Sequence, residues 1–243
     1  MKKRFIVALT IFPIALMFLS GPEAIARTYT TSFPRTENPI SEGGNWINGK
    51  VVGLDWNNVS TTPGLAIGHQ PGNVHYTDGT ALLSGLWGSN QTVQATVYVG
   101  TTYSDDFPEV EIRLRSSLLA HSCTGYEIAF KAFKDSSSYM AIARWNGPVG
   151  SFTVLTQLHG YQFGVANGDV VKATIIGNVI TAYINGVQKA QVTDSTYTTG
   201  NPGMGFNYYC SGVCRGARTA YGFTSFSATD GISSTKVLRR IKP

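Results

Sequence analysis

The sequence predicts an all-β fold built from antiparallel strands. Between Trp46 and Asp230 no amphipathic helical stripe reaches about ten residues, whereas short runs of β-branched and aromatic residues recur between turn signals. The pairs Gly177-Asn178 and Asn185-Gly186 each lie between apolar residues, and such pairs accept the positive φ angles of two-residue hairpin turns. Strands spaced in this way are typical of a sandwich or a barrel.

The predicted strands form a series of short runs along the chain. In order they are residues 81–87, 92–100, 109–117, 125–133, 138–145, 151–158, 169–177, 178–186, 187–194, 203–209 and 221–228. Turn-forming residues separate them, and the 27 glycines serve these turns. Apolar and polar residues alternate in 109–117 and 125–133, as expected for strands with one buried face. The two hairpin turns join 169–177, 178–186 and 187–194 into a meander.

The two ends of the chain are expected to lie outside the folded domain. MKKR followed by the apolar run FIVALTIFPIALMFL and by Ala24-Ile25-Ala26 predicts a signal peptide, residues 1–26, that is cleaved after Ala26. The mature chain would then be secreted or periplasmic and would contain no transmembrane segment. We expect an extended lead-in over residues 27–44, one sandwich domain over 45–230, and a basic tail over 231–243.

The net charge of +5 arises at the ends of the chain and not in the predicted domain. Once the signal peptide and the tail KVLRRIKP are set aside, 12 Lys and Arg face 13 Asp and Glu. Nucleic-acid binding needs basic residues concentrated on one folded face. The composition therefore argues against a nucleic-acid partner.

Three cysteines, Cys123, Cys210 and Cys214, occur in a chain that is expected to be exported. An oxidising compartment favours one disulfide and one remaining thiol, most simply Cys210 with Cys214, although either could pair with Cys123. A zinc site that adds His121 is disfavoured, because zinc thiolates usually come as C-x2-C pairs.

Several long segments carry a resemblance to a known superfamily. The segments at residues 32–46, 125–155, 168–197, 199–206 and 221–230 resemble concanavalin A-like lectins and glucanases, and most nearly the laminin-G-like domains of bacterial exported proteins. The likeness spans most of residues 33–230. It implies a two-sheet antiparallel jelly-roll sandwich, a concave sheet on which glycans bind, and a structural calcium ion. Because this fold hosts lectins, hydrolases, lyases and adhesion modules, it does not by itself assign an activity.

The polar faces of three neighbouring strands are the candidate ligand-binding site. If 109–117, 125–133 and 138–145 pair as a meander, their polar side chains share one floor. The predicted ligand-binding residues are Glu111, Arg113, Arg115, Glu127, Lys131, Arg144 and Trp145. Arginine suits bidentate recognition of a carboxylate or sulfate on a sugar. The alternative is a solvated face with cross-strand ion pairs.

The calcium ion that the resemblance implies needs several oxygen donors at strand ends. Asp55, Asp78 and Asp230 are the acidic residues in such positions.

Two catalytic versions of the fold can be compared with the sequence. Glycoside hydrolases of the superfamily carry two carboxylates and a following acid on one strand. PEVEIRLR supplies Glu109 and Glu111, but arginine or leucine stands where the acid should follow. An alginate-lyase-like arrangement would use Arg113, Gln157, His159 and Tyr183. It requires His159 and Tyr183 to enter the same groove as Arg113.

The sequence therefore favours a secreted, non-catalytic module that binds a glycan or polysaccharide, either as a lectin or as a laminin-G-like adhesion domain. The alternatives are a polysaccharide lyase acting on uronate-containing glycans and a cell-envelope domain that binds a protein partner.

Overall fold

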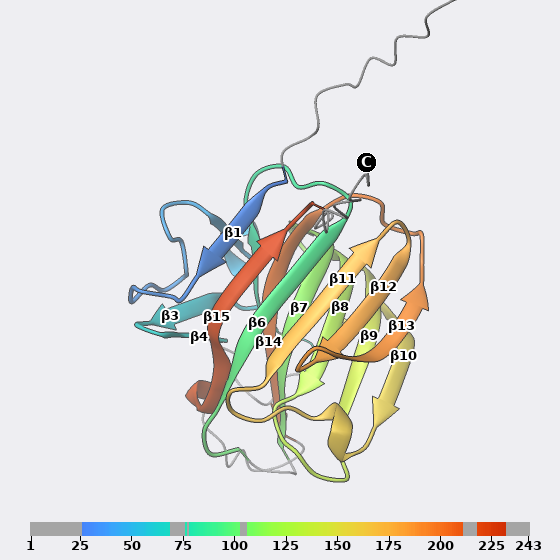
Figure 1. The fold of residues 1–243 in the computed structure, drawn as a ribbon. Helices are drawn as coiled ribbons and strands as arrows, with labels where there is room; N and C mark the ends of the chain where they lie inside the picture. Colours follow the sequence, from blue (N-terminus) through green and yellow to red (C-terminus); the bar gives the residue numbers. More distant parts are fainter. Residues whose placement is uncertain (1–25, 69–75, 77, 103–105, 211–217, 232–243) are drawn as a thin grey trace, which may run out of the picture.

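The structure, a computed structural model, describes residues 26–68, 76, 78–102, 106–210 and 218–231. Two antiparallel β-sheets pack face to face, which confirms the predicted two-sheet sandwich (Figure 1). Within these ranges, no helix has the length and apolar character needed to cross a membrane. The predicted signal peptide, except for Ala26, and nearly all of the basic tail lie outside the described residues.

The first sheet, called here the β6 sheet, lies in front in Figure 1. Its strand order is β13 (Val187–Thr193), β12 (Val179–Ile184), β11 (Val170–Ile176), β6 (Gln91–Val99), β15 (Tyr221–Thr229), β4 (Leu65–Gly68) and β3 (Val59–Thr62), and β1 (Thr28–Thr31) also pairs with β15. Part of the predicted lead-in therefore forms a strand of the sandwich.

The second sheet, called here the β7 sheet, lies behind it. Its order is β10 (Phe152–His159), β9 (Tyr139–Gly147), β8 (Ser122–Lys131), β7 (Asp106–Leu119), β14 (Asn201–Cys210), β5 (Gly79–Leu83) and β2 (Trp46–Asn48). The described residues also form three short 3₁₀ helices: η1 (Lys50–Val52), η2 (Tyr161–Phe163) and η3 (Arg218–Ala220). The predicted meander of three strands is present as β7, β8 and β9.

Both predicted hairpin tips occur where the sequence places them. Gly177 has φ 59°, and Asn185 and Gly186 have φ 52° and 76°, so each tip uses the left-handed region that such turns require. The side chain of Asn185 also accepts a hydrogen bond from the backbone N–H of Val170 at 2.8 Å. These turns join β11, β12 and β13 into the second predicted meander.

The core lies between the two sheets, and strand alternation decides which side chains enter it. Ile112 on β7, Ile128 on β8 and Ile142 on β9 are completely buried, and they lie opposite one another in register. Since neighbouring residues of a strand point to opposite faces, Glu111 and Glu127 lie on the outer face of the β7 sheet. This outer face carries the candidate site.

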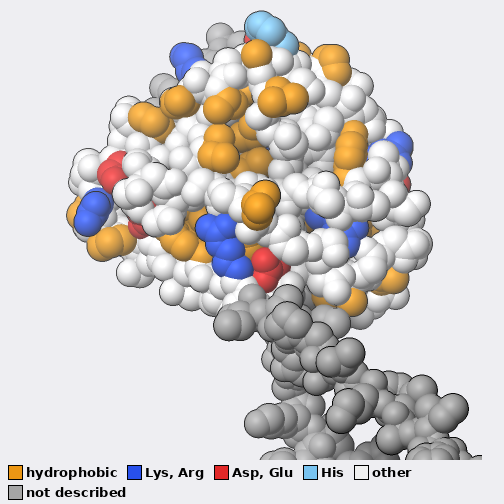
Figure 2. All heavy atoms as spheres, turned by 90° about the horizontal axis from the view of Figure 1, so that it is seen from above, with side chains coloured by type: hydrophobic (Ala, Val, Ile, Leu, Met, Phe, Trp, Pro, Cys, Tyr) orange, Lys and Arg blue, Asp and Glu red, His pale blue; other side chains and the backbone are white. Residues whose placement is uncertain are grey.

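One end of the sandwich, seen from above the view of Figure 1, has a mixed surface. Figure 2 shows hydrophobic, basic and acidic side chains in several separate places among neutral atoms.

Candidate functional site

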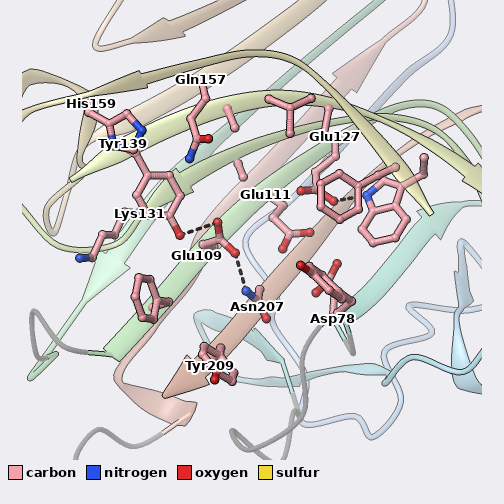
Figure 3. A pocket seen from close by; sticks show the side chains of 18 of the residues that line it. Asp78, Glu109, Glu111, Glu127, Lys131, Tyr139, Gln157, His159, Asn207 and Tyr209 are labelled. Carbon is pink, nitrogen blue, oxygen red and sulfur yellow. Dashed lines mark hydrogen bonds between the residues drawn. The ribbon is translucent and has the colours of Figure 1, made fainter. Parts of the chain in front are cut away.

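A cavity of about 570 Å³ lies on the outer face of the β7 sheet (Figure 3). Strands β7 to β10 and β14 supply most of its lining. The lining residues are Tyr76, Asp78, Phe107, Glu109, Glu111, Glu127, Ala129, Lys131, Ser137, Tyr139, Ala141, Ala143, Trp145, Phe152, Val154, Gln157, His159, Asn207 and Tyr209. Small alanines on β8 and β9 leave the space, while larger aromatic and polar side chains surround it.

Three carboxylates meet at one end of the cavity around a buried arginine. Arg113 is completely buried. Its Nη2 lies 2.9 Å from Asp78 and 2.5 Å from Glu111, and its Nη1 lies 2.7 Å from Glu127. Because Glu127 is the cross-strand partner of Arg113, the pairing of β7 with β8 builds half of this cluster. The guanidinium also lies 4.8 Å from the ring centre of Trp56, within the range of a cation–π contact.

A glycine on the neighbouring strand β14 makes room for this cluster. Gly205 is the cross-strand partner of Glu111. A Cβ at Gly205 would overlap the Glu111 carboxylate and would lie 3.1 Å from Nε of Arg113. The absence of a side chain at Gly205 therefore lets Glu111 and Arg113 approach the backbone of β14 closely.

A second carboxyl network lies further along the floor. Tyr139 donates its hydroxyl hydrogen to Glu109 at 2.7 Å, and Asn207 donates from Nδ2 to the other oxygen of Glu109 at 2.5 Å (Figure 3). Lys131, which is also buried, donates to the hydroxyl of Ser137 at 2.8 Å. These bonds hold the polar groups of the floor in fixed positions.

Burial and the charges of neighbouring carboxylates raise the pKa values of Asp78, Glu109 and Glu111. Burial, reinforced by the charge of Glu127, raises the pKa of Asp78 to about 8 and that of Glu109 to about 7. Burial also raises the pKa of Glu111 well above its usual range, and the charges of Asp78 and Glu127 add to this effect. Burial alone would lower the pKa of Arg113, but the surrounding carboxylates outweigh it and keep the guanidinium charged.

Aromatic side chains form the walls. Trp145 is 3% exposed, and its indole N–H donates to Glu127 at 2.5 Å. Phe152 packs against Trp145 with ring centres 5.0 Å apart, and Tyr76 packs against Phe152 at 5.3 Å. At the other end, the rings of Tyr139 and His159 lie 6.0 Å apart. The cavity thus combines flat apolar surfaces with oriented hydrogen-bonding groups.

Five of the seven predicted ligand-binding residues meet at this site. Glu111, Glu127, Lys131 and Trp145 line the cavity, and Arg113 lies beneath its carboxylates. The sequence predicts Asp78 as a calcium ligand only, and it predicts no role for Tyr139 or Asn207. The alternating pattern of 138–145 was the available signal for Tyr139, since it shares a face with Trp145.

Arg115 does not reach the floor, contrary to the prediction. The β7–β8 register shifts between Leu114 and Ser117, and Arg115 has φ 44°. This bulge redirects the guanidinium, which donates to the backbone carbonyls of Ser89, Tyr197 and Gly177. Arg115 therefore ties loops together instead of facing the cavity.

Arg144 lies on the opposite face of β9 from the predicted floor. It shares alternation with the buried core residues Met140 and Ile142, whereas Trp145 is on the cavity side. The Arg144 guanidinium is 2.6 Å from Asp194 and 2.7 Å from the hydroxyl of Thr196. It connects the β7 sheet to the chain that follows β13.

The predicted lyase residues do not assemble. Gln157 and His159 line the cavity, and Arg113 lies beneath its floor. Tyr183, however, lies on β12 of the β6 sheet, where its ring is 5.0 Å from Nζ of Lys172. The lyase arrangement requires Tyr183 in the same groove as Arg113. Since Tyr183 lies on the other sheet, the predicted lyase role of Tyr183 is wrong.

The predicted calcium ligands are also separated by their contacts. Asp55 pairs with His121 at 2.8 Å, and Asp230 accepts from the backbone N–H groups of Arg27 and Gly88. Asp78 joins Arg113 instead.

Among the described residues, a different acidic group, Asp78, Glu111 and Glu127, has ligand atoms within 4.8 Å of one another. The Arg113 guanidinium already lies against all three carboxylates. Calcium needs six to eight oxygen ligands, so this group does not fit a calcium ion.

Of the three cysteines, Cys123 is a free and buried thiol, and burial raises its pKa to about 12. Cys210 is buried at the end of β14, and Cys214 lies outside the described residues. The Cys210–Cys214 disulfide stays a prediction.

Comparisons with known proteins place this geometry in a structural context. No protein-family model and no curated sequence matches the chain. The structure is similar to the carbohydrate-binding module CBM66 of Bacillus subtilis, with 14% identity, 77% of this chain and 92% of that chain covered, and a TM-score of 0.50.

Two further solved structures are similar over most of their length. The metal-free carbohydrate recognition domain of Emp46p has 12% identity and a TM-score of 0.55, with 84% of this chain and 97% of that chain covered. The κ-carrageenase of Zobellia galactanivorans has 11% identity and a TM-score of 0.53, with 88% and 98% covered. Identities this low show a common fold and no more. The chain has the same two-sheet jelly-roll fold as these structures.

Proposed function

We propose that this chain is a secreted, non-catalytic module that binds a glycan in the cavity of the β7 sheet. The observation that carries the proposal is the pairing, in one cavity, of aromatic walls with a floor of fixed hydrogen-bonding groups. The predicted signal peptide supports secretion, and the resemblance to carbohydrate-binding modules and lectins supports the ligand class.

A sugar ring matches both kinds of surface. One side of the ring is formed by C–H groups that pack on an aromatic face, and its rim carries hydroxyls that donate and accept hydrogen bonds. Tyr76 and Phe152 supply a pair of aromatic rings tilted by 60° to each other, and Gln157 and Asn207 supply amide groups. Ligand sites in proteins typically have this composition, with apolar walls and a few oriented polar groups.

The contacts of the carboxylates favour binding over hydrolysis. A retaining glycosidase needs a nucleophile and an acid about 5 Å apart, both directed at the scissile bond. Glu111 and Glu127 are instead bound to Arg113, and Glu127 also accepts from Trp145. A carboxylate held in these bonds is a weakened nucleophile. The arrangement therefore supports a role for Glu111 and Glu127 as fixed polar groups of the binding site.

The test is a glycan-array screen of the chain from Arg27 to Pro243, with hits measured by titration calorimetry. We expect Gln157→Ala and Tyr76→Ala each to weaken binding about 10-fold or more, because both side chains are exposed at the cavity. Tyr183→Ala on the opposite sheet is the matched control and should bind normally.

Hits are also incubated with the protein and assayed for new reducing ends and for the ultraviolet absorbance of unsaturated uronate. Release of either product would overturn the non-catalytic part of the proposal. Failure to bind any glycan, or binding that both cavity substitutions leave unchanged, would overturn the proposed function itself.

A further inference from the structure

We infer that the glycan bound in this cavity carries a free amino group, whose ammonium lies against the carboxylates of the floor. This inference rests on the proposed function and specifies the chemical class of its ligand. Three observations on the floor support it: the balance of charge, the acceptors that have no partner, and the position of Arg113 beneath the carboxylates that it pairs with.

The cavity has more acidic than basic groups. Asp78, Glu109, Glu111 and Glu127 all line it, and Lys131 is the one lysine or arginine among the described lining residues. Arg113 supplies a further positive charge from beneath the floor. Four carboxyls thus share two permanent cations, so the floor can accept positive charge from a ligand.

The acceptors of the floor point to the same conclusion. Glu111 is 1% exposed and lines the cavity, yet its Oε1 atom has no hydrogen-bond partner in the described structure (Figure 3). Asn207 also lines the cavity, and its Oδ1 atom lacks a hydrogen-bond partner in the described structure. A buried acceptor without a donor costs free energy, and a bound group that donates would remove this cost. An ammonium offers three donors and no acceptor.

Arg113 cannot serve as a receptor for an acidic sugar. Its terminal nitrogens are engaged by Asp78, Glu111 and Glu127, and it does not line the cavity. A uronate or sulfate at this end of the cavity would therefore meet the carboxylates before it met Arg113. The structure reverses the sequence-based expectation that the arginines recognise an acidic sugar.

The proton affinity of the floor agrees with this assignment. Burial, together with the charge of Glu127, raises the pKa of Asp78 to about 8 and that of Glu109 to about 7, as expected where carboxyls lack sufficient positive charge. An ammonium against the floor supplies that charge and lowers these pKa values.

The test compares sugars that differ in the amine alone. Titration calorimetry would measure oligosaccharides of glucosamine and of galactosamine, their N-acetylated forms, and a galacturonate oligosaccharide, at a pH at which the amines are protonated. The amine-bearing sugars are expected to bind at least 10-fold more tightly than their N-acetylated forms. The galacturonate should bind most weakly.

Glu111→Gln should reduce the preference for the amine at least 10-fold while N-acetylated sugars still bind. Asp55→Asn, which removes an acidic group paired with His121 outside the cavity, is the matched control and should keep the preference. Thermal unfolding checks that each variant folds, and Glu109→Gln replaces Glu111→Gln if the latter does not.

The outcomes separate the two proposals. Equal or tighter binding of N-acetylated or acidic sugars would overturn the inference and leave glycan binding intact. An amine preference that Glu111→Gln and Glu109→Gln both leave unchanged would also overturn it, because the ammonium would then lie elsewhere. Binding of no glycan at all would reject both proposals.

Discussion

Replacing Glu109 with glutamine should make the protein more stable at mildly alkaline pH. Glu109 is held on the cavity floor by Tyr139 and Asn207. Burial, and then the charge of Glu127, raises its pKa from 4.5 to about 7. A carboxyl whose pKa is higher in the folded than in the unfolded state retains its proton on folding. Its ionisation therefore destabilises the fold as the pH rises between the two values.

The magnitude follows from the size of the shift. Each pKa unit corresponds to about 1.4 kcal/mol, so a shift of this size lowers the free energy of unfolding by about 3 kcal/mol between about pH 5 and pH 8. Glutamine does not ionise. It can accept from Asn207 through its oxygen and donate from its amide to the Tyr139 hydroxyl, so the local bonds are retained.

Urea unfolding at about pH 5, 6, 7 and 8 measures this difference. The wild type and Glu109→Gln should be nearly equal in stability at the lowest pH and diverge by about 3 kcal/mol at the highest. Asp135→Asn is the control, because hydrogen bonds from Ser137 outweigh burial and lower the pKa of Asp135. That carboxylate is ionised in both states across this range. Parallel wild-type and Glu109→Gln curves would refute the reasoning.

Three further predictions concern single residues. Arg113→Met should lower the free energy of unfolding at neutral pH by about 3–5 kcal/mol, because three carboxylates lose their buried counter-charge. This loss of stability should become smaller as the pH falls and the carboxylates are protonated. If urea unfolding finds the variant as stable as the wild type, the prediction is contradicted. Gly205→Ala should destabilise by about 1–3 kcal/mol and displace Glu111, since the added methyl overlaps its carboxylate; a crystal structure with Glu111 unmoved would show that the backbone yields instead. Asn185→Ala should lower the free energy of unfolding by about 1–2 kcal/mol, because alanine is strained at this positive φ and the hydrogen bond from Val170 is lost. Thermal unfolding measures the change, and an unchanged Tm would contradict the prediction.

The middle and the C-terminal half of the fold are predictable because their pairings are local. β7, β8 and β9 follow one another along the chain, and alternation alone assigns Ile112 to the core and Glu111 to the outer face. The hairpin tips are predictable because each contains a Gly-Asn or Asn-Gly pair, which accepts positive φ angles. By contrast, β2, β3 and β4 have only three or four residues each, too few for a recognisable alternation.

The site is less predictable because its residues come from distant segments and because alternation fails at one place. Asp78 reaches Arg113 only through the order β7, β14 and β5, which no local pattern specifies. The bulge at Arg115 has a trace in the sequence. Gly125 interrupts β8 opposite it, and a Cβ there would lie 2.6 Å from the carbonyl oxygen of Arg115. A glycine inside a strand often marks such a close approach.

The buried arginine gives this site its specific character. The free energy needed to remove charged groups from water offsets much of the attraction between them. The presence of the Arg113 cluster therefore does not by itself indicate a large net contribution to stability. Its geometric effect is more definite, because one guanidinium sets the positions of Asp78, Glu111 and Glu127. Oε1 of Glu111 remains without a partner in the cavity. Under the proposed function, Arg113 therefore acts on the ligand through the carboxylates that it orients, and their charge is opposite to that of the arginine.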